Sequence, residues 1–186
     1  MKIDVHKLVK GKKTYPSWAT NASHILRTEN RDKELLVYYL TKSNRRISRI
    51  FPNQLDLTPS FIYALGLLKG EGSNSLGKSN YRRLTITNND YHLINLILEE
   101  LEKSNLFKRS DLIDKSLHLL HHQDSDKKVI EYWSKCLHLP KKKFKCFNDE
   151  RKTTPSGTCH VYISDVLLRR ILDLVHDEFF NFPKPL

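Results

Sequence analysis

The chain has 186 residues, enough for one domain with a sizeable core. Lys and Arg number 32 against 21 Asp and Glu, so the net charge is +11. A basic excess of this size indicates a polyanionic partner, with nucleic acid foremost, although lysines that only maintain solubility would give the same composition. Neither an apolar leader nor a run of ~20 apolar residues is present, so we expect an intracellular protein (cytoplasm, nucleoid or organelle matrix) without a membrane-spanning segment.

The three cysteines also bear on the compartment. Cys136, Cys146 and Cys159 are odd in number and widely spaced. This pattern excludes a disulfide framework, and no pair has the short spacing of a structural zinc site. A reducing compartment fits best.

Residues 1–57 are interpreted as a basic N-terminal extension, either an arm or a small helical element. Basic clusters lie at 10–13 and 45–49. Between them, the spacing of Leu35, Leu36, Tyr39 and Leu40 predicts a helix over roughly 32–41. A helix-turn-helix and a basic arm packed on the main domain both remain open.

The sequence from residue 58 alternates helices and strands more clearly. Thr58 followed by Pro59 is typical of a helix start, and the apolar positions predict a helix to about Gly70. A hairpin is expected next, with strands near 73–76 and 81–87.

Asn88 or Asn89 is expected to cap the following helix. Later elements are predicted as a strand at 116–122, a helix that Ser125 caps and Pro140 ends, strands at 144–147 and 158–164, a helix from Asp165 to about Asp177, and an irregular tail at 179–186. This order indicates an α+β fold, with an antiparallel or mixed sheet, helices on one face and an open face able to lie against a duplex.

One helix carries an unusual set of small residues. Ile62, Gly66 and Gly70 recur every four residues and therefore form one ridge of the helix. Glycine inside a helix costs up to ~1 kcal/mol relative to alanine, and close packing against a second helix would offset that cost. Glu71 follows at the helix end, where the helix dipole disfavours negative charge and a bound cation would relieve the conflict.

The nine residues Ala64-Leu65-Gly66-Leu67-Leu68-Lys69-Gly70-Glu71-Gly72 resemble the motif of the LAGLIDADG homing-endonuclease family. The hairpin, Arg82–Asp90, Glu131–Lys135 with Leu139-Pro140, and Gly157–Ile163 resemble later parts of the same family. The resemblance covers residues 58–178. Lys69 stands where the family name has an acid, and Glu71 replaces an aspartate.

The resemblance implies a LAGLIDADG-like fold and a sequence-specific, metal-dependent endonuclease of double-stranded DNA. In the family, two motif helices pack through their small residues and their acids bind a divalent metal, usually Mg²⁺. Because the chain shows one motif, we expect a homodimer packed through Ile62, Gly66 and Gly70, with one Glu71 from each subunit as catalytic and metal-binding residue. Lys78 and Arg83 are candidates for the basic catalytic residue. The alternative is a protein of this fold that binds DNA or RNA, as a regulator or intron-splicing factor, and has lost cleavage.

The expected DNA-contacting residues lie on the hairpin. Arg83, Thr85 and Thr87 share one strand face, opposite Leu84 and Ile86. The further candidates on the neighbouring strand and turn are Ser73, Ser75 and Lys78. A solvated sheet face would show the same alternation.

The histidines at 118, 121 and 122 suggest either metal ligands or a polar surface. Since no matching cysteine or aspartate cluster accompanies them in sequence, we favour surface histidines and assign His118 to the DNA-contacting set.

Overall fold

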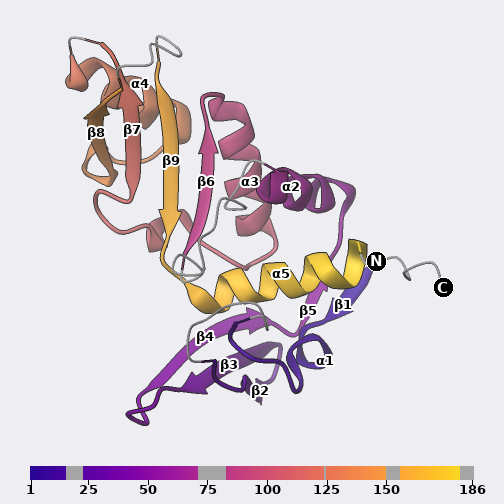
Figure 1. Cartoon of the computed structure of the whole chain (residues 1–186). Coiled ribbons are helices and arrows are strands. Elements are labelled where there is room, and N and C mark those ends of the chain that lie inside the picture. Colours follow the sequence, from indigo (N-terminus) through magenta and orange to yellow (C-terminus); the bar gives the residue numbers. More distant parts are fainter. Residues whose placement is uncertain (16–22, 71–82, 124, 150–155, 181–186) are drawn as a thin grey trace, which may run out of the picture.

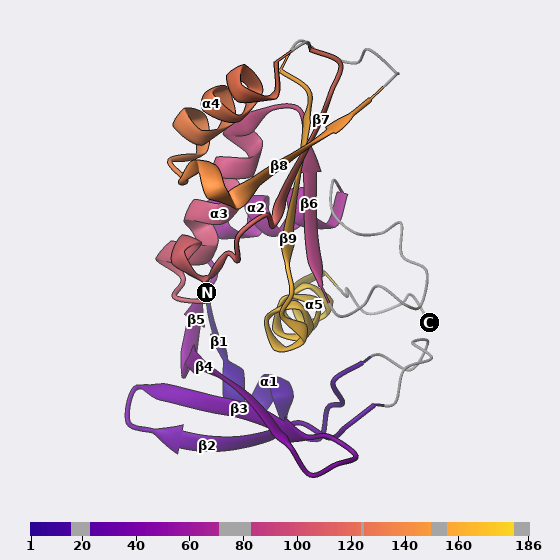
Figure 2. The same ribbon diagram turned by 90° about the vertical axis from the view of Figure 1, so that its left-hand side faces the viewer.

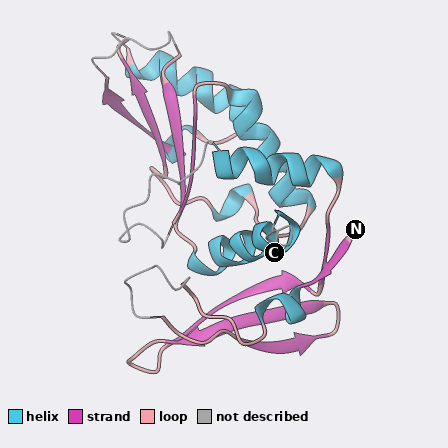
Figure 3. Cartoon of the chain, turned by 45° about the vertical axis from the view of Figure 1, so that its right-hand side comes forward, coloured by secondary structure: helices cyan, strands magenta, loops and turns pink. Residues whose placement is uncertain are grey.

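The computed structural model describes residues 1–15, 23–70, 83–123, 125–149 and 156–180. The fold is α+β, as the sequence predicts, with five α-helices and several sheets among the described residues. A four-stranded sheet with helices on one side forms the upper part of the molecule, and a smaller β-rich part lies below it, with helix α5 between them (Figure 1). Figure 3 shows the same separation of strands into an upper and a lower group.

The main sheet has the strand order β6-β9-β7-β8, formed by Leu84–Asn88, Thr158–Ile163, Leu117–His121 and Phe144–Asn148. β9 pairs antiparallel with both β6 and β7, whereas β8 pairs parallel with β7. The sheet is therefore mixed. The strands predicted at 116–122, 144–147 and 158–164 are confirmed.

Helices cover one face of this sheet, and no helix or strand of the described residues covers the other (Figure 2). α3 (Tyr91–Lys103) and α4 (Asp126–Leu137) pack their apolar sides on the buried residues of the strands, which include Ile86, Leu119 and Val161. This burial of every second strand residue produces the alternation seen in the sequence.

The helix starts show how local sequence sets the elements. Ser125 accepts the amide hydrogen of Lys128 and caps α4 as predicted. The cap of α3 is Asp90, which accepts from His92, so the prediction of Asn88 or Asn89 was wrong. Asn88 is instead the last residue of β6, paired with Cys159.

Helix α2 spans Pro59–Gly70, and its first turn is capped by Thr58, whose Oγ1 accepts the amide hydrogen of Phe61 at 3.1 Å. Its buried residues, which include Phe61, Leu65 and Leu68, pack toward α3. The predicted helix is confirmed. The first strand and the turn of the expected hairpin fall on residues 71–82, outside the described residues.

Residues 1–57 are mainly β-structure. β2 (Arg27–Arg31), β3 (Glu34–Leu40) and β4 (Arg46–Pro52) form an antiparallel sheet, called here the N-terminal sheet. β1 (Lys2–Asp4) pairs antiparallel with β5 (Gln54–Asp56), and the short helix α1 (Val5–Val9) lies between β1 and the N-terminal sheet in sequence.

The predicted helix over 32–41 was wrong, because that segment is the central strand of the N-terminal sheet. Leu35, Leu36 and Val37 are all buried, although they alternate between the two faces. A central strand covered on both faces buries consecutive residues, and this removes the period of two that would have identified it. The helix-turn-helix interpretation fails with it.

Helix α5 (Val166–Phe180) holds the two parts together. Arg170 donates its Nε hydrogen to the carbonyl of Lys13 at 2.8 Å, and Arg169 donates to the carbonyl of Arg83 at 2.7 Å. Both arginine side chains are buried, so one helix satisfies backbone acceptors of both parts. The helix continues to Phe180, so the tail predicted from residue 179 begins later than expected.

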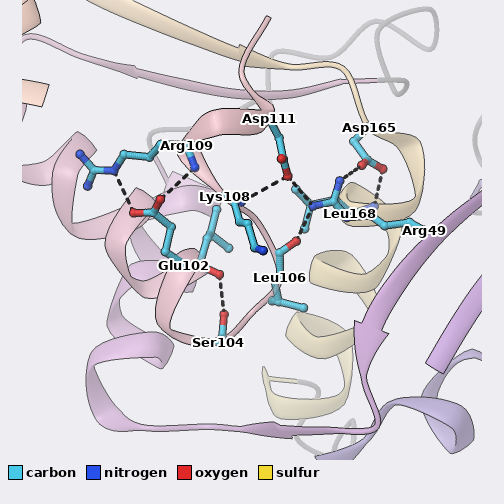
Figure 4. A network of polar contacts seen from close by, with 10 residues as sticks. Arg49, Glu102, Ser104, Leu106, Lys108, Arg109, Asp111, Asp165 and Leu168 are labelled. Atoms are coloured by element: carbon cyan, nitrogen blue, oxygen red, sulfur yellow. Dashed lines mark hydrogen bonds and ion pairs between the residues drawn. The ribbon is translucent and has the colours of Figure 1, made fainter. Parts of the chain in front are cut away.

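Arg49 of β4 provides a second connection (Figure 4). Its guanidinium forms an ion pair with Asp165, lies 3.5 Å from Asp111, and donates to the carbonyl of Leu106 at 2.7 Å. Asp165 also accepts the amide hydrogen of Leu168 and thereby caps α5. One arginine from the N-terminal sheet thus contacts two segments of the other part.

Candidate nucleic-acid interface

The open face of the main sheet presents polar and aromatic side chains from all four strands. The register places Thr85 opposite Tyr162 and Thr87 opposite His160. His118 lies between His160 and Lys145 on the neighbouring strands. Together with Arg83, Leu120, Phe147 and Thr158, these residues are called here the open face. Their alternate neighbours fill the core beneath.

Four rings form a row across the strands of the open face. The ring centroid of His118 lies 4.8 Å from that of Phe147 and 4.7 Å from that of Tyr162. His160 stacks on Tyr162 with an interplanar angle of 11°, and its Nδ1 lies 2.9 Å from Thr87 Oγ1. These contacts fix the rings in place before any ligand arrives.

Two cations lie against rings of this row. Arg83 lies over the Tyr162 ring, 4.6 Å from its centroid, and the Lys145 ammonium lies 4.8 Å from the centroid of Phe147. No residue of the open face carries a carboxylate. The open face therefore has a positive potential and offers hydrogen-bond donors, hydroxyl groups and rings to a polyanion.

His118 is the central titratable group of the open face. Its partial burial lowers the pKa of His118 below the ordinary value of 6.5, and the positive charges of Lys145 and Arg83 lower this pKa further. A hydrogen bond with the backbone of Lys115 acts in the opposite direction but does not outweigh them. His118 is therefore predominantly neutral at pH 7. It can offer a ring and one hydrogen-bond donor, whereas the charge comes from Arg83 and Lys145.

Among the described residues, nothing covers the face of α2 that carries the glycines. Gly66 and Gly70 are exposed, and a Cβ built on either would meet nothing within 4 Å. Ile62 is half-buried, and Tyr63, which lies on the same side, is 57% exposed. This notched, partly apolar face is available to a second helix.

The predicted catalytic, metal-binding and DNA-contacting residues divide into two groups. Arg83, Thr85, Thr87 and His118 come together on the open face. The remaining candidates, Glu71, Ser73, Ser75 and Lys78, lie outside the described residues.

Several residues of the open face had no predicted role, namely Lys145, Phe147, His160 and Tyr162. For β9, the alternation of Val161 and Ile163 with His160 and Tyr162 already indicated which side chains share a face. For β8, no local signal was available. The chain runs from β7 through α4 to β8, and the parallel pairing of β8 with β7 sets the position of Lys145.

A separate cluster joins three chemically reactive side chains on the covered side of the sheet. Donor atoms of His121, Asp126 and Cys146 all lie within 4.8 Å of one another. Neither the histidines nor the cysteines suggested this group in the sequence, because β7, α4 and β8 bring it together.

The proton positions in this cluster argue against a ready metal site. Burial, with the Asp126 charge, raises the pKa of Cys146 to about 11, so the group is a thiol. His121 Nδ1 accepts the Gln123 amide hydrogen at 3.1 Å, which leaves the proton of the neutral ring on Nε2. That nitrogen lies 3.1 Å from Asp126 Oδ1, without the geometry of a hydrogen bond. A metal would have to displace protons from two of three donors.

Comparisons of the chain with protein-family models, with curated proteins and with solved structures found no match. Among the described residues, no helix combines the length and apolar character needed to cross a membrane. The structure itself defines the class: an α+β protein with a cationic, aromatic open sheet face.

Proposed function

We propose that the chain is a subunit of a homodimeric, sequence-specific DNA endonuclease with a LAGLIDADG-like fold. One observation carries the proposal: the uncovered glycine face of α2 and the carboxylate-free open face of the main sheet belong to the same part of the molecule. The first suits close packing with the same helix of a second copy. The second suits a duplex that lies across the strands.

The open face supplies both kinds of contact that a DNA reader requires. Arg83 and Lys145 suit phosphate oxygens, which position the duplex without reading sequence. Thr85, Thr87 and the histidines offer short donors and acceptors to base edges. A dimer would repeat this arrangement, so the recognised site would be palindromic or nearly so.

Cleavage is proposed from the resemblance and from donor chemistry. Glu71 follows α2 directly in the sequence, and its carboxylate oxygens are the hard donors that Mg²⁺ prefers. Two such residues in a dimer would hold Mg²⁺, which supplies activation of water and charge neutralisation at a phosphate. Among the described residues at this end of α2, Asp173 is ion-paired with Lys69 and lies 3.8 Å from Arg169, so Glu71 is the acidic ligand that we propose.

A plasmid-library cleavage assay with Mg²⁺ tests the activity. The native protein is expected to produce double-strand breaks that stop when EDTA removes the metal. Glu71→Gln keeps the size and shape of the side chain but removes its charge, so the variant should bind DNA and not cut it. Specific binding with no cleavage by either protein would contradict the endonuclease proposal.

The dimer has its own test. Gly66→Leu is expected to keep the subunit folded, because the position faces open space, and to abolish dimer formation in analytical ultracentrifugation. Tyr132→Leu is a suitable control, because Tyr132 is also exposed but lies on α4. A dimer that persists in Gly66→Leu would exclude α2 as the contact.

The row of rings favours a second candidate, a protein of the same fold that binds nucleic acid without cutting it. Aromatic rings and arginine planes stack well on unpaired bases, which RNA loops expose. His118, Phe147 and Tyr162 form such a platform. This candidate predicts tighter binding to single-stranded RNA than to a duplex of the same length.

A further inference from the structure

A groove of about 970 Å³ runs between the N-terminal sheet and the lower end of the main sheet. Residues of the N-terminal part form one wall, including Tyr39, Lys42 and Arg45. Arg83, Ser164 and Asp165, at the ends of β6 and β9, form the other. Two parts of the chain that are far apart in sequence therefore share one concave surface.

The charges that line the groove are predominantly positive. Lys42, Arg45 and Arg83 are the Lys and Arg residues among its described lining, and Asp165 is the single carboxylate. The charge of Asp165 is already compensated by its ion pair with Arg49. Among the described residues, neither Lys42 nor Arg45 has an acidic partner within ion-pair distance. The described lining of the groove thus carries a net positive charge, which complements a phosphate backbone.

The turn that carries Lys42 and Arg45 is held by its own hydrogen bonds. The Thr41 amide donates to the Arg45 carbonyl at 2.9 Å, and the Asn44 amide donates to the Thr41 carbonyl at 2.9 Å. Thr41 Oγ1 accepts the Arg45 amide hydrogen at 3.1 Å. A turn closed in this way loses little backbone entropy when its cations bind a ligand.

Arg83 connects this groove with the open face. It lines the groove, and it lies over the Tyr162 ring at the edge of the open face. Its carbonyl is held by Arg169 of α5, so its position relative to both parts is fixed. Figure 2 shows the turn between β3 and β4 below the main sheet, away from α3 and α4. The open face and the groove can therefore contact successive stretches of one duplex.

We infer that the N-terminal sheet is a second DNA-binding element, in which Lys42 and Arg45 contact backbone phosphates of the duplex that the open face binds. The inference rests on the proposed function and extends it to residues 1–57. The contacts are to phosphates, so they add affinity and extend the bound length without reading bases.

The test uses the double variant Lys42→Gln and Arg45→Gln in the full chain, with a long mixed-sequence duplex as the probe. Its matched control is Arg31→Gln with Lys33→Gln, which removes the same charge from the same sheet. The control residues lie at the β2–β3 turn, the other end of β3, roughly 20 Å away for a strand of this length. Fluorescence anisotropy over a salt series gives the slope of log K against log salt.

Loss of two phosphate contacts should reduce the magnitude of that slope by about 2 in the groove variant. The control should keep the native slope. Equal slopes for the native protein and the groove variant would overturn the inference. In that case, duplex binding by the native protein would still support the proposed function. No duplex binding by the native protein would contradict both. A slope change seen only with single-stranded RNA would also overturn the inference.

Discussion

His118 illustrates how a single residue acquires its character from strands that are distant in sequence. β8 and β9 place Phe147, Tyr162 and Lys145 around it, and β6 adds the charge of Arg83. The sequence assigned His118 to the DNA-contacting set, and β7 places it on the open face. It could not predict the neighbours, because pairing between strands is a non-local property of the fold.

The lowered pKa of His118 has a measurable consequence. Below pH 6.5 the unfolded chain takes up a proton at this ring before the folded chain does, so stability should fall as the pH drops from 6.5 to the folded value. A histidine NMR titration is expected to give a value below 6.5 for His118 in the free protein. Bound duplex should raise that value, since phosphates favour the charged ring.

His118→Gln removes the titrating ring, so the free energy of unfolding measured in urea should depend less on pH between 6.5 and the pKa of His118 in the folded protein. A native titration at or above 6.5 would contradict the surroundings described for this residue.

At the scale of the element, the predictions succeeded where helices and strands have one covered face. α4, β7 and β9 each bury one side, so the periods of 3.6 and two residues remain visible in the sequence. α2 is apolar on most of its surface, and its start at Thr58 and Pro59 identified it instead. β3 has covered residues on both faces and was misassigned. The groove beside it could not be predicted, since its walls come from separate parts of the chain.

Gly66 provides a test of the α2 surface within the subunit. Gly66→Ala should stabilise an isolated subunit by roughly 0.5–1 kcal/mol, because alanine favours a helix and the new methyl group meets no atom within 4 Å. Urea denaturation at low protein concentration measures the change.

The matched control is Gly157→Ala. There the backbone has φ +74°, and a Cβ would lie 2.4 Å from the Leu120 carbonyl oxygen, so this variant should be clearly destabilised. A loss of stability in Gly66→Ala would show that the glycine face is covered within the subunit.

At the scale of the whole molecule, a shared hydrophobic core and a few polar side chains set the relative placement of the two parts. Arg49 reaches from β4 to Asp165 and to the Leu106 carbonyl. Both members of the ion pair are only 20% exposed, so their charges are largely removed from water. Losing one partner would leave the other charge buried without compensation.

Arg49→Met is therefore expected to lower the free energy of unfolding by about 3 kcal/mol and to loosen the groove between the sheets. Arg46→Met serves as the control, since Arg46 pairs with Glu29 on the surface and should change the urea midpoint little. Equal effects of both substitutions would show that the Arg49 connection does not hold the two parts together.

The position of α5 also determines when the chain can fold during its synthesis. This helix is the last described element of the chain, yet its residues satisfy carbonyl groups of Lys13 and Arg83 and fill the space between both sheets. On a ribosome, the segments that depend on it emerge long before it does. Neither half can complete its buried contacts early, so maturation should occur as one late, cooperative event and not by stepwise completion from the first residue onward.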